Sequence, residues 1–305
     1  MNGRLEINLY FGKKKIKVTI LAIAAILVVL AACLAIIIML PGRGFTTVQQ
    51  ARKYLVSRRY IIHAGGLVSD EAGAEHSYTN SIEALNNCYD NGNRVSEFDF
   101  MITADDEVVC AHGDDDNVLW AHGVENAGWY DNPPTLSNFK AATFEGGLTT
   151  MSLDDLASFM NEHDDFYVVT DVKDNNVLTC RMISEKYPKL RDNFIVQIYH
   201  PDEYDKIKEL GFSYIIYTLY RATEDELLPE SLKEAAGHGN LVGFCFWDGF
   251  AEQFPESYEV LKESKLPLFV HTVNDKDAMK KFIEEGINGI YTDVVNKEDQ
   301  YTEGE

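Results

Sequence analysis

The chain has 305 residues, of which 46% are hydrophobic and 25% are charged. This length and apolar content are sufficient for one large domain or two small ones, and they exclude a disordered protein. The formal net charge at pH 7 is −22, which argues against a nucleic-acid partner, because an acidic surface repels a phosphate backbone.

The first 40 residues predict a membrane anchor. A basic segment, residues 1–17, precedes an uncharged apolar run at residues 18–40, which is long enough to cross a bilayer as a helix. Positive charge favours the cytoplasmic side, so we expect a single-pass transmembrane helix in the cell membrane, a cytoplasmic N-terminus and the rest of the chain outside. A cleaved signal peptide is the main alternative, and a lipoprotein signal at "LAAC", ending at Cys33, is another.

Beyond the anchor, strand-like runs alternate with helix-like runs. After a predicted linker at residues 41–58, the expected strands are residues 60–64, 95–100, 107–112, 166–172, 194–199, 214–219, 241–247, 266–272 and 289–293. The expected helices are residues 152–163, 201–210, 224–236 and 275–285. About eight strand units with helical crossovers predict an α/β fold, a closed (β/α)8 TIM barrel. A doubly wound open sheet is the alternative.

We place the boundaries of the barrel domain at residues 59 and 298, with an acidic tail at residues 299–305. Residues 113–150 interrupt the alternation and are rich in Asp, Gly, Asn and Pro. We expect them to form a loop excursion over one mouth of the barrel.

Polar residues interrupt the expected strands near their C-terminal ends, which in a barrel meet at one face. Glu97 and Asp99 are two residues apart on one strand, so their carboxylates point to the same side. With Asp171 they supply the oxygen ligands that Ca²⁺ or Mg²⁺ prefers, and we predict a divalent cation site there. The other polar residues at such positions are His63, His112, Lys173, Gln197, Tyr217, His271 and Asp293.

A series of short motifs resembles the glycerophosphodiester phosphodiesterase family. The segments "YIIHAGG", "YTNSIEAL", "EFD", "AH", "DVK", "HTVND" and "GINGIYTD" occur in the family's order between residues 60 and 293. The resemblance implies a (β/α)8 barrel that cleaves a phosphodiester with a divalent cation and two histidines. Motif by motif, it implies that His63 and His112 are catalytic, that Glu97, Asp99 and Asp171 are metal ligands, and that Lys173 faces the phosphate. Asn80, Gln197 and His271 are the remaining predicted substrate contacts.

The chain departs from the family pattern at several of these motifs. Ala64, Thr79, Gly113, Asp171 and His271 stand where the family usually has Arg, Glu, Asp, Glu and Trp. Without the Arg, a bidentate phosphate contact is missing. The pairs His112-Gly113 and Asp171-x-Lys173 also resemble the related sphingomyelinase D phospholipases. Bacterial phosphatidylinositol-specific phospholipase C has a barrel with two histidines but lacks this metal cluster.

We therefore expect an extracellular, membrane-anchored, metal-dependent phosphodiesterase that uses histidine acid/base catalysis. Its expected substrates are glycerophosphodiesters, phospholipid headgroups or a cell-surface polymer such as teichoic acid or capsule. The alternative is a catalytically inactive barrel that binds a phosphorylated surface polymer or a partner protein, which the changes at Ala64 and Thr79 favour. A glycosidase is a weaker alternative, because Glu97 and Asp99 on one strand lie too close together to straddle a sugar bond.

Overall fold

The chain divides into two compact units, Met1–Arg43 and Gly44–Glu305. The computed structural model describes residues 6–11, 14–19, 45–113, 118–119, 129 and 132–302. In the first unit, strands β1 (Glu6–Phe11) and β2 (Lys14–Thr19) form an antiparallel hairpin that covers most of the expected basic segment.

The structure differs from the expected membrane helix at its start. Val18 and Thr19, the first two residues of the expected span, belong to strand β2. The rest of that span, residues 20–40, lies outside the described residues. Within the part of the chain that the structure describes, we find no helix with the length and apolar character needed to cross a bilayer.

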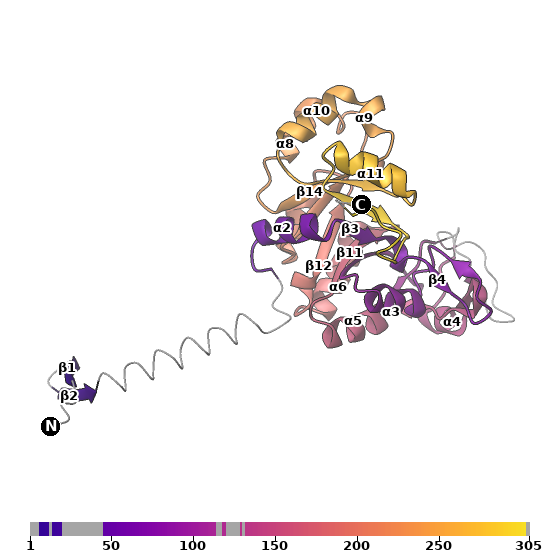
Figure 1. The fold of residues 1–305 in the computed structure, drawn as a ribbon. Coiled ribbons are helices and arrows are strands. Elements are labelled where there is room, and N and C mark those ends of the chain that lie inside the picture. Colours follow the sequence, from indigo (N-terminus) through magenta and orange to yellow (C-terminus); the bar gives the residue numbers. More distant parts are fainter. Residues whose placement is uncertain are drawn as a thin grey trace. The chain divides into compact units, whose positions relative to one another are not determined.

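The described part of the second unit contains eight parallel strands that close into a barrel (Figure 1). In order around the barrel they are β3 (Tyr60–Ile62), β6 (Val95–Ile102), β11 (Tyr167–Val172), β12 (Phe194–Ile198), β13 (Ile215–Thr218), β14 (Leu241–Trp247), β15 (Leu268–His271) and β16 (Gly289–Thr292). Strand β16 pairs with β3, and β3 pairs with β6, which closes the circle. The predicted α/β fold of the TIM-barrel type is confirmed, and an open sheet is excluded.

Helices follow the strands and cover the outside of the barrel (Figure 1). They are α3 (Ile82–Asp90), α5 (Leu153–Glu162), α6 (Asn176–Lys186), α7 (Glu203–Glu209), α8 (Pro229–Ala235), α9 (Phe250–Gln253), α10 (Pro255–Glu263) and α11 (Lys276–Glu284). Helix α5 shows why they form: Ser152 and Asp155 make a capping box, and Leu153, Leu156 and Met160 recur at helical spacing and are buried. The larger hydrophobic core lies between these helices and the strands.

A helix that we did not expect packs against the barrel. Residues 41–58 were predicted to be a linker, but they contain α2 (Val48–Arg58), with Thr47 as its N-cap. Ala51 and Leu55 pack with the side chains that fill the barrel interior. Arg52 donates hydrogen bonds of 3.1 and 2.6 Å to the carbonyl of Leu241, the first residue of β14. Helix α2 therefore contacts the N-terminal ends of the strands and leaves the C-terminal ends for a site.

The expected loop excursion contains secondary structure and a small core of its own. Strand β7 (Val108–Cys110), which we expected among the barrel strands, instead pairs antiparallel with β6 and with β10 (Met151–Ser152). Helix α4 (Leu136–Ala141) and strands β8 (Val118–Leu119) and β9 (Thr143–Phe144) follow β7. Strands β4 (Val68–Ser69) and β5 (Glu75–His76) form a hairpin, and Val68 of β4 shares a hydrophobic cluster with Phe139 of α4, beside the barrel in Figure 1.

Candidate active site

Three buried carboxylates lie together on two neighbouring barrel strands. Glu97 and Asp99 come from β6, and Asp171 of β11 lies directly opposite Asp99 in the parallel register. One oxygen atom from each of the three lies within 4.8 Å of the others. The predicted acidic cluster is thus formed, because alternation along β6 brings two carboxylates to one side and strand pairing adds the third.

Lys173 lies between two of these carboxylates. Its Nζ atom is 2.7 Å from Oδ1 of Asp99 and 2.7 Å from Oδ2 of Asp171. The other oxygen of Asp171 accepts hydrogen bonds from the hydroxyls of Tyr199 and Tyr220. Burial opposes the charge of Asp171, but Lys173 and the two tyrosines outweigh it and lower the pKa of Asp171 to about 2. Asp171 is therefore ionised at neutral pH.

Glu97 is the least compensated member of the cluster. Its Oε2 atom accepts a hydrogen bond of 3.0 Å from the backbone N–H of Ala64, whereas its buried Oε1 atom has no hydrogen-bond partner among the described residues. Burial, together with the negative charge of Asp99, raises the pKa of Glu97 to about 8. The cluster thus has more negative charge than Lys173 can balance.

These features fit a divalent cation. Carboxylate oxygens are the donors that Ca²⁺ and Mg²⁺ prefer, and the unpartnered Oε1 of Glu97 is a buried acceptor that such an ion would satisfy. Asn80 holds one of the three donors in place: its side chain donates to Oδ2 of Asp99 (2.8 Å) and accepts from the Asp99 backbone N–H (3.0 Å). The identity of the ion stays a prediction.

His63 follows β3 directly and lies beside the cluster. Its Nδ1 atom is 2.8 Å from Oδ1 of Asp293, and its Nε2 atom is 4.0 Å from Oε2 of Glu97. Burial disfavours the charged ring, but the hydrogen bond with Asp293 and the charges of Glu97 and Asp293 outweigh it and raise the pKa of His63 to about 9. The imidazole of His63 is thus protonated near neutral pH in this structure.

His112 lies two residues beyond β7 and is connected to His63 through one aromatic ring. The ring of Tyr78 lies 4.6 Å from that of His63 and 4.8 Å from that of His112, centroid to centroid. The backbone next to His112 is also tied to the cluster, because the N–H of Ala111 donates to the carbonyl of Asp99 (3.1 Å). The antiparallel strand β7 therefore delivers the second histidine to the site.

The three predicted substrate contacts lie in different surroundings. Both polar atoms of the Asn80 side chain bond Asp99, as described above. Gln197 is buried in β12, where its side-chain oxygen accepts hydrogen bonds from the hydroxyls of Thr218 and Tyr291. His271 ends β15, and its ring packs edge-on against that of Tyr220 at 5.3 Å. Burial lowers the pKa of His271 to about 4, so its ring is neutral at physiological pH. Substrate contacts by these three residues stay predictions.

Several residues of the site had no predicted role. They are Tyr78, Tyr199, Tyr220 and Asn274, together with Asp293, which we noted only as a polar residue at a strand end. The position of Asp293 at the end of the last barrel strand could have predicted its contact with His63, because β16 lies next to β3 in a closed barrel. Tyr220 follows β13 and Tyr78 precedes α3, where no spacing marks them, whereas Tyr199 ends the expected strand 194–199, two residues after Gln197.

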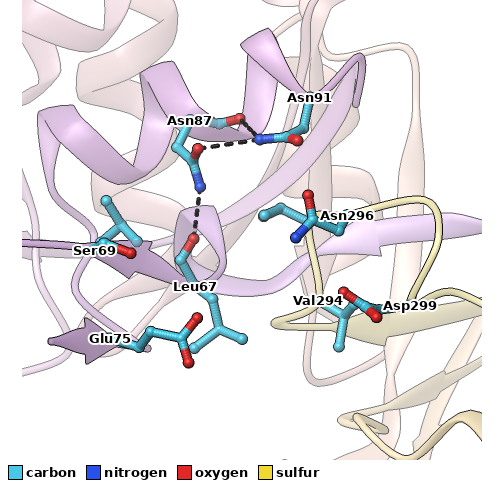
Figure 2. Close-up of a pocket in the computed structure, with 10 residues that line it drawn as sticks. Leu67, Ser69, Glu75, Asn87, Asn91, Val294, Asn296 and Asp299 are labelled. Atoms are coloured by element: carbon cyan, nitrogen blue, oxygen red, sulfur yellow. Dashed lines mark hydrogen bonds between the residues drawn. The ribbon is translucent and has the colours of Figure 1, made fainter. Parts of the chain in front are cut away.

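A separate cavity of about 300 Å³ lies between the β4–β5 hairpin, α3 and the segment after β16 (Figure 2). Its polar lining consists of Ser69, Glu75, Asn87, Asn91, Asn296 and Asp299. The side chain of Asn87 donates to the carbonyl of Leu67 (2.7 Å), and Nδ2 of Asn91 donates to the backbone carbonyl (2.9 Å) and to Oδ1 (3.1 Å) of Asn87, as Figure 2 shows. None of its lining residues is a Lys or Arg, so this cavity does not suit an anionic phosphodiester.

Comparison with known proteins agrees with this geometry. Residues 72–297 match the sequence model of the Glycerophosphoryl diester phosphodiesterase family, a range that contains the predicted site residues except His63. Comparison with curated protein sequences gives no significant match.

Solved structures of low sequence identity share the fold. A glycerophosphoryl diester phosphodiesterase structure from Silicibacter pomeroyi has a TM-score of 0.61 and 16% identity over 79% of this chain and 92% of that chain. A glycerophosphodiester phosphodiesterase from Thermotoga maritima has a TM-score of 0.56 and 20% identity over 78% and 95%. An Oleispira antarctica phosphodiesterase, solved with the product sn-glycerol-3-phosphate, has a TM-score of 0.56 and 16% identity over 78% and 94%.

Proposed function

Because this chain belongs to the glycerophosphoryl diester phosphodiesterase family, and is thus a phosphoric diester hydrolase, we propose that it cleaves small glycerophosphodiesters with the help of a divalent cation. The observation that carries this proposal is the buried group formed by Glu97, Asp99 and Asp171, with Lys173 bound to two of its members and His63 beside it. In such a group, the cation and Lys173 would attract a phosphoryl anion, and His63 would transfer a proton.

Glu97, Asp99 and Asp171 would hold the cation, which when bound would reduce the negative charge on a phosphoryl oxygen. Lys173 adds a positive charge fixed by its two carboxylate partners. These two carboxylates hold the pKa of Lys173 far above its usual range even though burial disfavours the ammonium, so Lys173 stays charged. The chain therefore presents a constant positive charge at the edge of the carboxylate group.

The environment of His63 suits a general acid. With the Nδ1 proton donated to Asp293, the Nε2 atom is directed toward the carboxylate group and, when protonated, donates to the leaving alkoxide. His112, on the other side of the Tyr78 ring, then accepts the proton of the attacking hydroxyl. Two histidines thus serve the two proton transfers of a diester cleavage. The attacking hydroxyl belongs either to water or to the substrate, and ³¹P NMR of the product distinguishes a linear from a cyclic phosphate.

The charge of the chain favours a small substrate. Residues 41–305 contain 22 basic and 48 acidic residues, a formal charge of −26, and such a surface repels a polyanionic polymer or an anionic bilayer at low ionic strength. The Oleispira antarctica relative was solved with sn-glycerol-3-phosphate as product, which supports a glycerophosphodiester for this chain too. Phospholipid headgroups and teichoic-acid-type polymers are the other members of a substrate panel.

We also propose an anchored, extracellular location, which rests on the sequence alone. Residues 20–40 are uncharged and, as a helix, about 30 Å long, which matches the bilayer core. The basic residues before them favour a cytoplasmic N-terminus. The test is to express the full chain, to separate membranes from soluble protein, and to treat intact cells with protease. A full chain that stays in the soluble fraction, or a barrel that protease reaches only after lysis, would contradict this location.

Activity is tested with the purified full chain in detergent. We expect release of glycerol phosphate from glycerophosphodiesters with Ca²⁺ or Mg²⁺, loss of activity in EDTA, and loss in His112→Ala. His238→Ala, whose ring stacks on Tyr204 on the outside of the barrel, is the control and should keep its activity. Turnover that survives both EDTA and His112→Ala would overturn the proposal. Binding of diesters without turnover would instead support the non-catalytic barrel.

A further inference from the structure

Tyr78 occupies the space between the two histidines of the site. It lies in the short segment between β5 and α3, and its half-buried ring packs against His63 at 4.6 Å and against His112 at 4.8 Å. Under the proposed function, these two imidazoles carry the two proton transfers of a diester cleavage. The Tyr78 side chain therefore borders the place where the phosphorus atom of a substrate would lie.

The charges of Asp99, Lys173, Glu97 and Asp171 all act on the hydroxyl of Tyr78. Burial first, and then the negative charges of this group, raise the pKa of Tyr78 well above its usual range. The hydroxyl therefore stays protonated at physiological pH and is available as a hydrogen-bond donor.

The backbone of Tyr78 adopts an energetically unfavourable conformation. Its φ angle is 63°, and that of Asn80 is 52°, both in the left-handed region that residues with side chains seldom adopt. The following residues anchor the turn: the N–H of Asn80 donates to the carbonyl of Ala64 (3.2 Å), Asn80 is locked to Asp99, and Ser81 caps helix α3. Backbone strain that the surroundings maintain in this way concentrates at functional sites.

A phosphodiester anion in this place needs hydrogen-bond donors in addition to the cation and His63. The ammonium of Lys173 is already paired with Asp99 and Asp171, and the side chain of Ala64, next to His63, has no donor. The carboxylates repel the phosphate oxygens unless donors lie between them. A protonated phenol provides a hydrogen bond without adding negative charge.

On the basis of the proposed function, we infer that Tyr78 is a substrate-contacting residue, whose hydroxyl donates a hydrogen bond to a phosphoryl oxygen while its ring keeps the two imidazoles on either side. This assigns a phosphate donor to a position at which the sequence motifs predict none. It also explains why an aromatic residue occupies a left-handed turn at the edge of the site.

The test compares Tyr78→Phe, which removes only the hydroxyl, with Tyr78→Leu, which also removes the ring, in the full chain. We expect Tyr78→Phe to lower kcat/KM for a glycerophosphodiester about tenfold or more, the size of a lost hydrogen bond to a charged group. The Kd for inorganic phosphate, measured by calorimetry, should rise by a similar factor. Tyr78→Leu should in addition lower kcat, because the two histidines lose their common neighbour.

Tyr187→Phe is the matched control. It removes a tyrosine hydroxyl that donates to Asp154 (2.6 Å) in the outer helical layer, and it should leave kcat/KM unchanged. The inference is overturned if Tyr78→Phe equals the parent chain in kcat/KM and in phosphate affinity, or if Tyr78→Leu raises kcat/KM, which would make Tyr78 an obstacle. If the parent chain hydrolyses no diester, the proposed function fails separately, and the phosphate titration decides: a tenfold loss in Tyr78→Phe supports the contact, and equal or undetectable binding in both proteins contradicts it.

Discussion

The Nδ1 atom of His63 and the Oδ1 atom of Asp293 are 2.8 Å apart, and these residues follow the first and the last strands of the barrel. Asn274, in the loop after β15, donates to the other oxygen of Asp293 at 2.6 Å. The orientation of His63 therefore depends on closure of the barrel, since Asp293 reaches it only because β16 pairs with β3.

The His63–Asp293 pair makes the stability of the cation-free protein depend on pH. The pKa of His63 is raised from 6.5 to about 9 in the folded state. Its contribution to the free energy of unfolding is therefore complete below pH 6.5 and is lost as the pH rises toward 9. The slope from this one group is at most about 1.4 kcal/mol per pH unit. Glu97, whose pKa is raised to about 8, also lowers the free energy of unfolding as the pH rises toward 8. We expect Asp293→Asn to have a shallower slope than the parent chain.

The measurement is urea unfolding in EDTA at several values between pH 6 and pH 9.5. Asp70→Asn is the control, since Asp70 pairs with His76 at 2.9 Å outside the site and its loss should keep the parent slope. If the free energy of unfolding of Asp293→Asn and of the parent chain changes with pH by the same slope, Asp293 does not hold the proton on His63.

Cation binding should release a proton from Glu97. Burial and the charge of Asp99 raise the pKa of Glu97 to about 8, so at pH 7 the carboxyl is largely protonated before the ion arrives. Affinity for Ca²⁺ or Mg²⁺ should then rise up to about tenfold per pH unit below pH 8 and level off above it. Calorimetry in buffers of different ionisation enthalpy measures the released proton directly.

Glu97→Gln should weaken cation binding and abolish this proton release, whereas Glu209→Gln, an exposed residue of α7, should change neither. An affinity that does not vary between pH 6 and pH 8 would mean that the ion binds elsewhere or that Glu97 is already ionised.

The sequence predicts those parts of the site that depend on spacing along one strand. Glu97 and Asp99 share a face of β6 because they are two residues apart, and this needs no knowledge of the fold. That Asp171 lies opposite Asp99 depends on the register between β6 and β11, and that His63 meets Asp293 depends on closure. No local sequence pattern predicts either contact. The positions of these residues at strand ends indicate only that all four lie at the same face of the barrel.

The spacing of the expected strands was sufficient to exclude residues 107–112 from the barrel. We expected residues 107–112 to be a barrel strand, but only residues 103–107 separate β6 from β7, which is too few for the crossover that parallel strands require. A hairpin was the only connection of that length. The linker at 41–58 was harder to correct, because Ala51 and Leu55 are the buried residues among the eleven of α2 and give a sparse apolar pattern.

His271 should act as part of the pocket wall and not as an acid or base. Burial lowers the pKa of His271 to about 4, so its ring is neutral between pH 5 and pH 9 and lacks the acidic proton of an imidazolium. Its buried Nε2 atom has no hydrogen-bond partner among the described residues. We expect His271→Phe to keep the shape of the pH–rate profile and most of the activity, since it retains the ring that packs on Tyr220. His112→Ala, by contrast, should lose about 100-fold or more. A pH–rate profile that changes in His271→Phe would assign His271 a proton-transfer role instead.

Lys173 should stabilise the cation-free site more than any exposed ion pair of similar geometry. Its side chain is 7% exposed and bridges Asp99 and Asp171, so Lys173→Met leaves buried carboxylates without a counter-charge, which typically costs about 3–5 kcal/mol. Lys186 is the matched control, because it also bridges two carboxylates, Glu107 at 2.8 Å and Asp154 at 2.7 Å, but is 38% exposed. Lys186→Met should therefore cost less than about 1 kcal/mol.

The same pair of variants separates electrostatic compensation from packing. In EDTA, Lys173→Met should melt well below Lys186→Met, and saturating Ca²⁺ or Mg²⁺ should raise the Tm of Lys173→Met more than that of the parent chain, because the ion replaces the missing positive charge. If both variants melt alike in EDTA, the carboxylates are neutralised by protons rather than by Lys173. If the melting temperature of Lys173→Met is low but insensitive to either ion, the loss is one of packing, and the three carboxylates do not form a cation site.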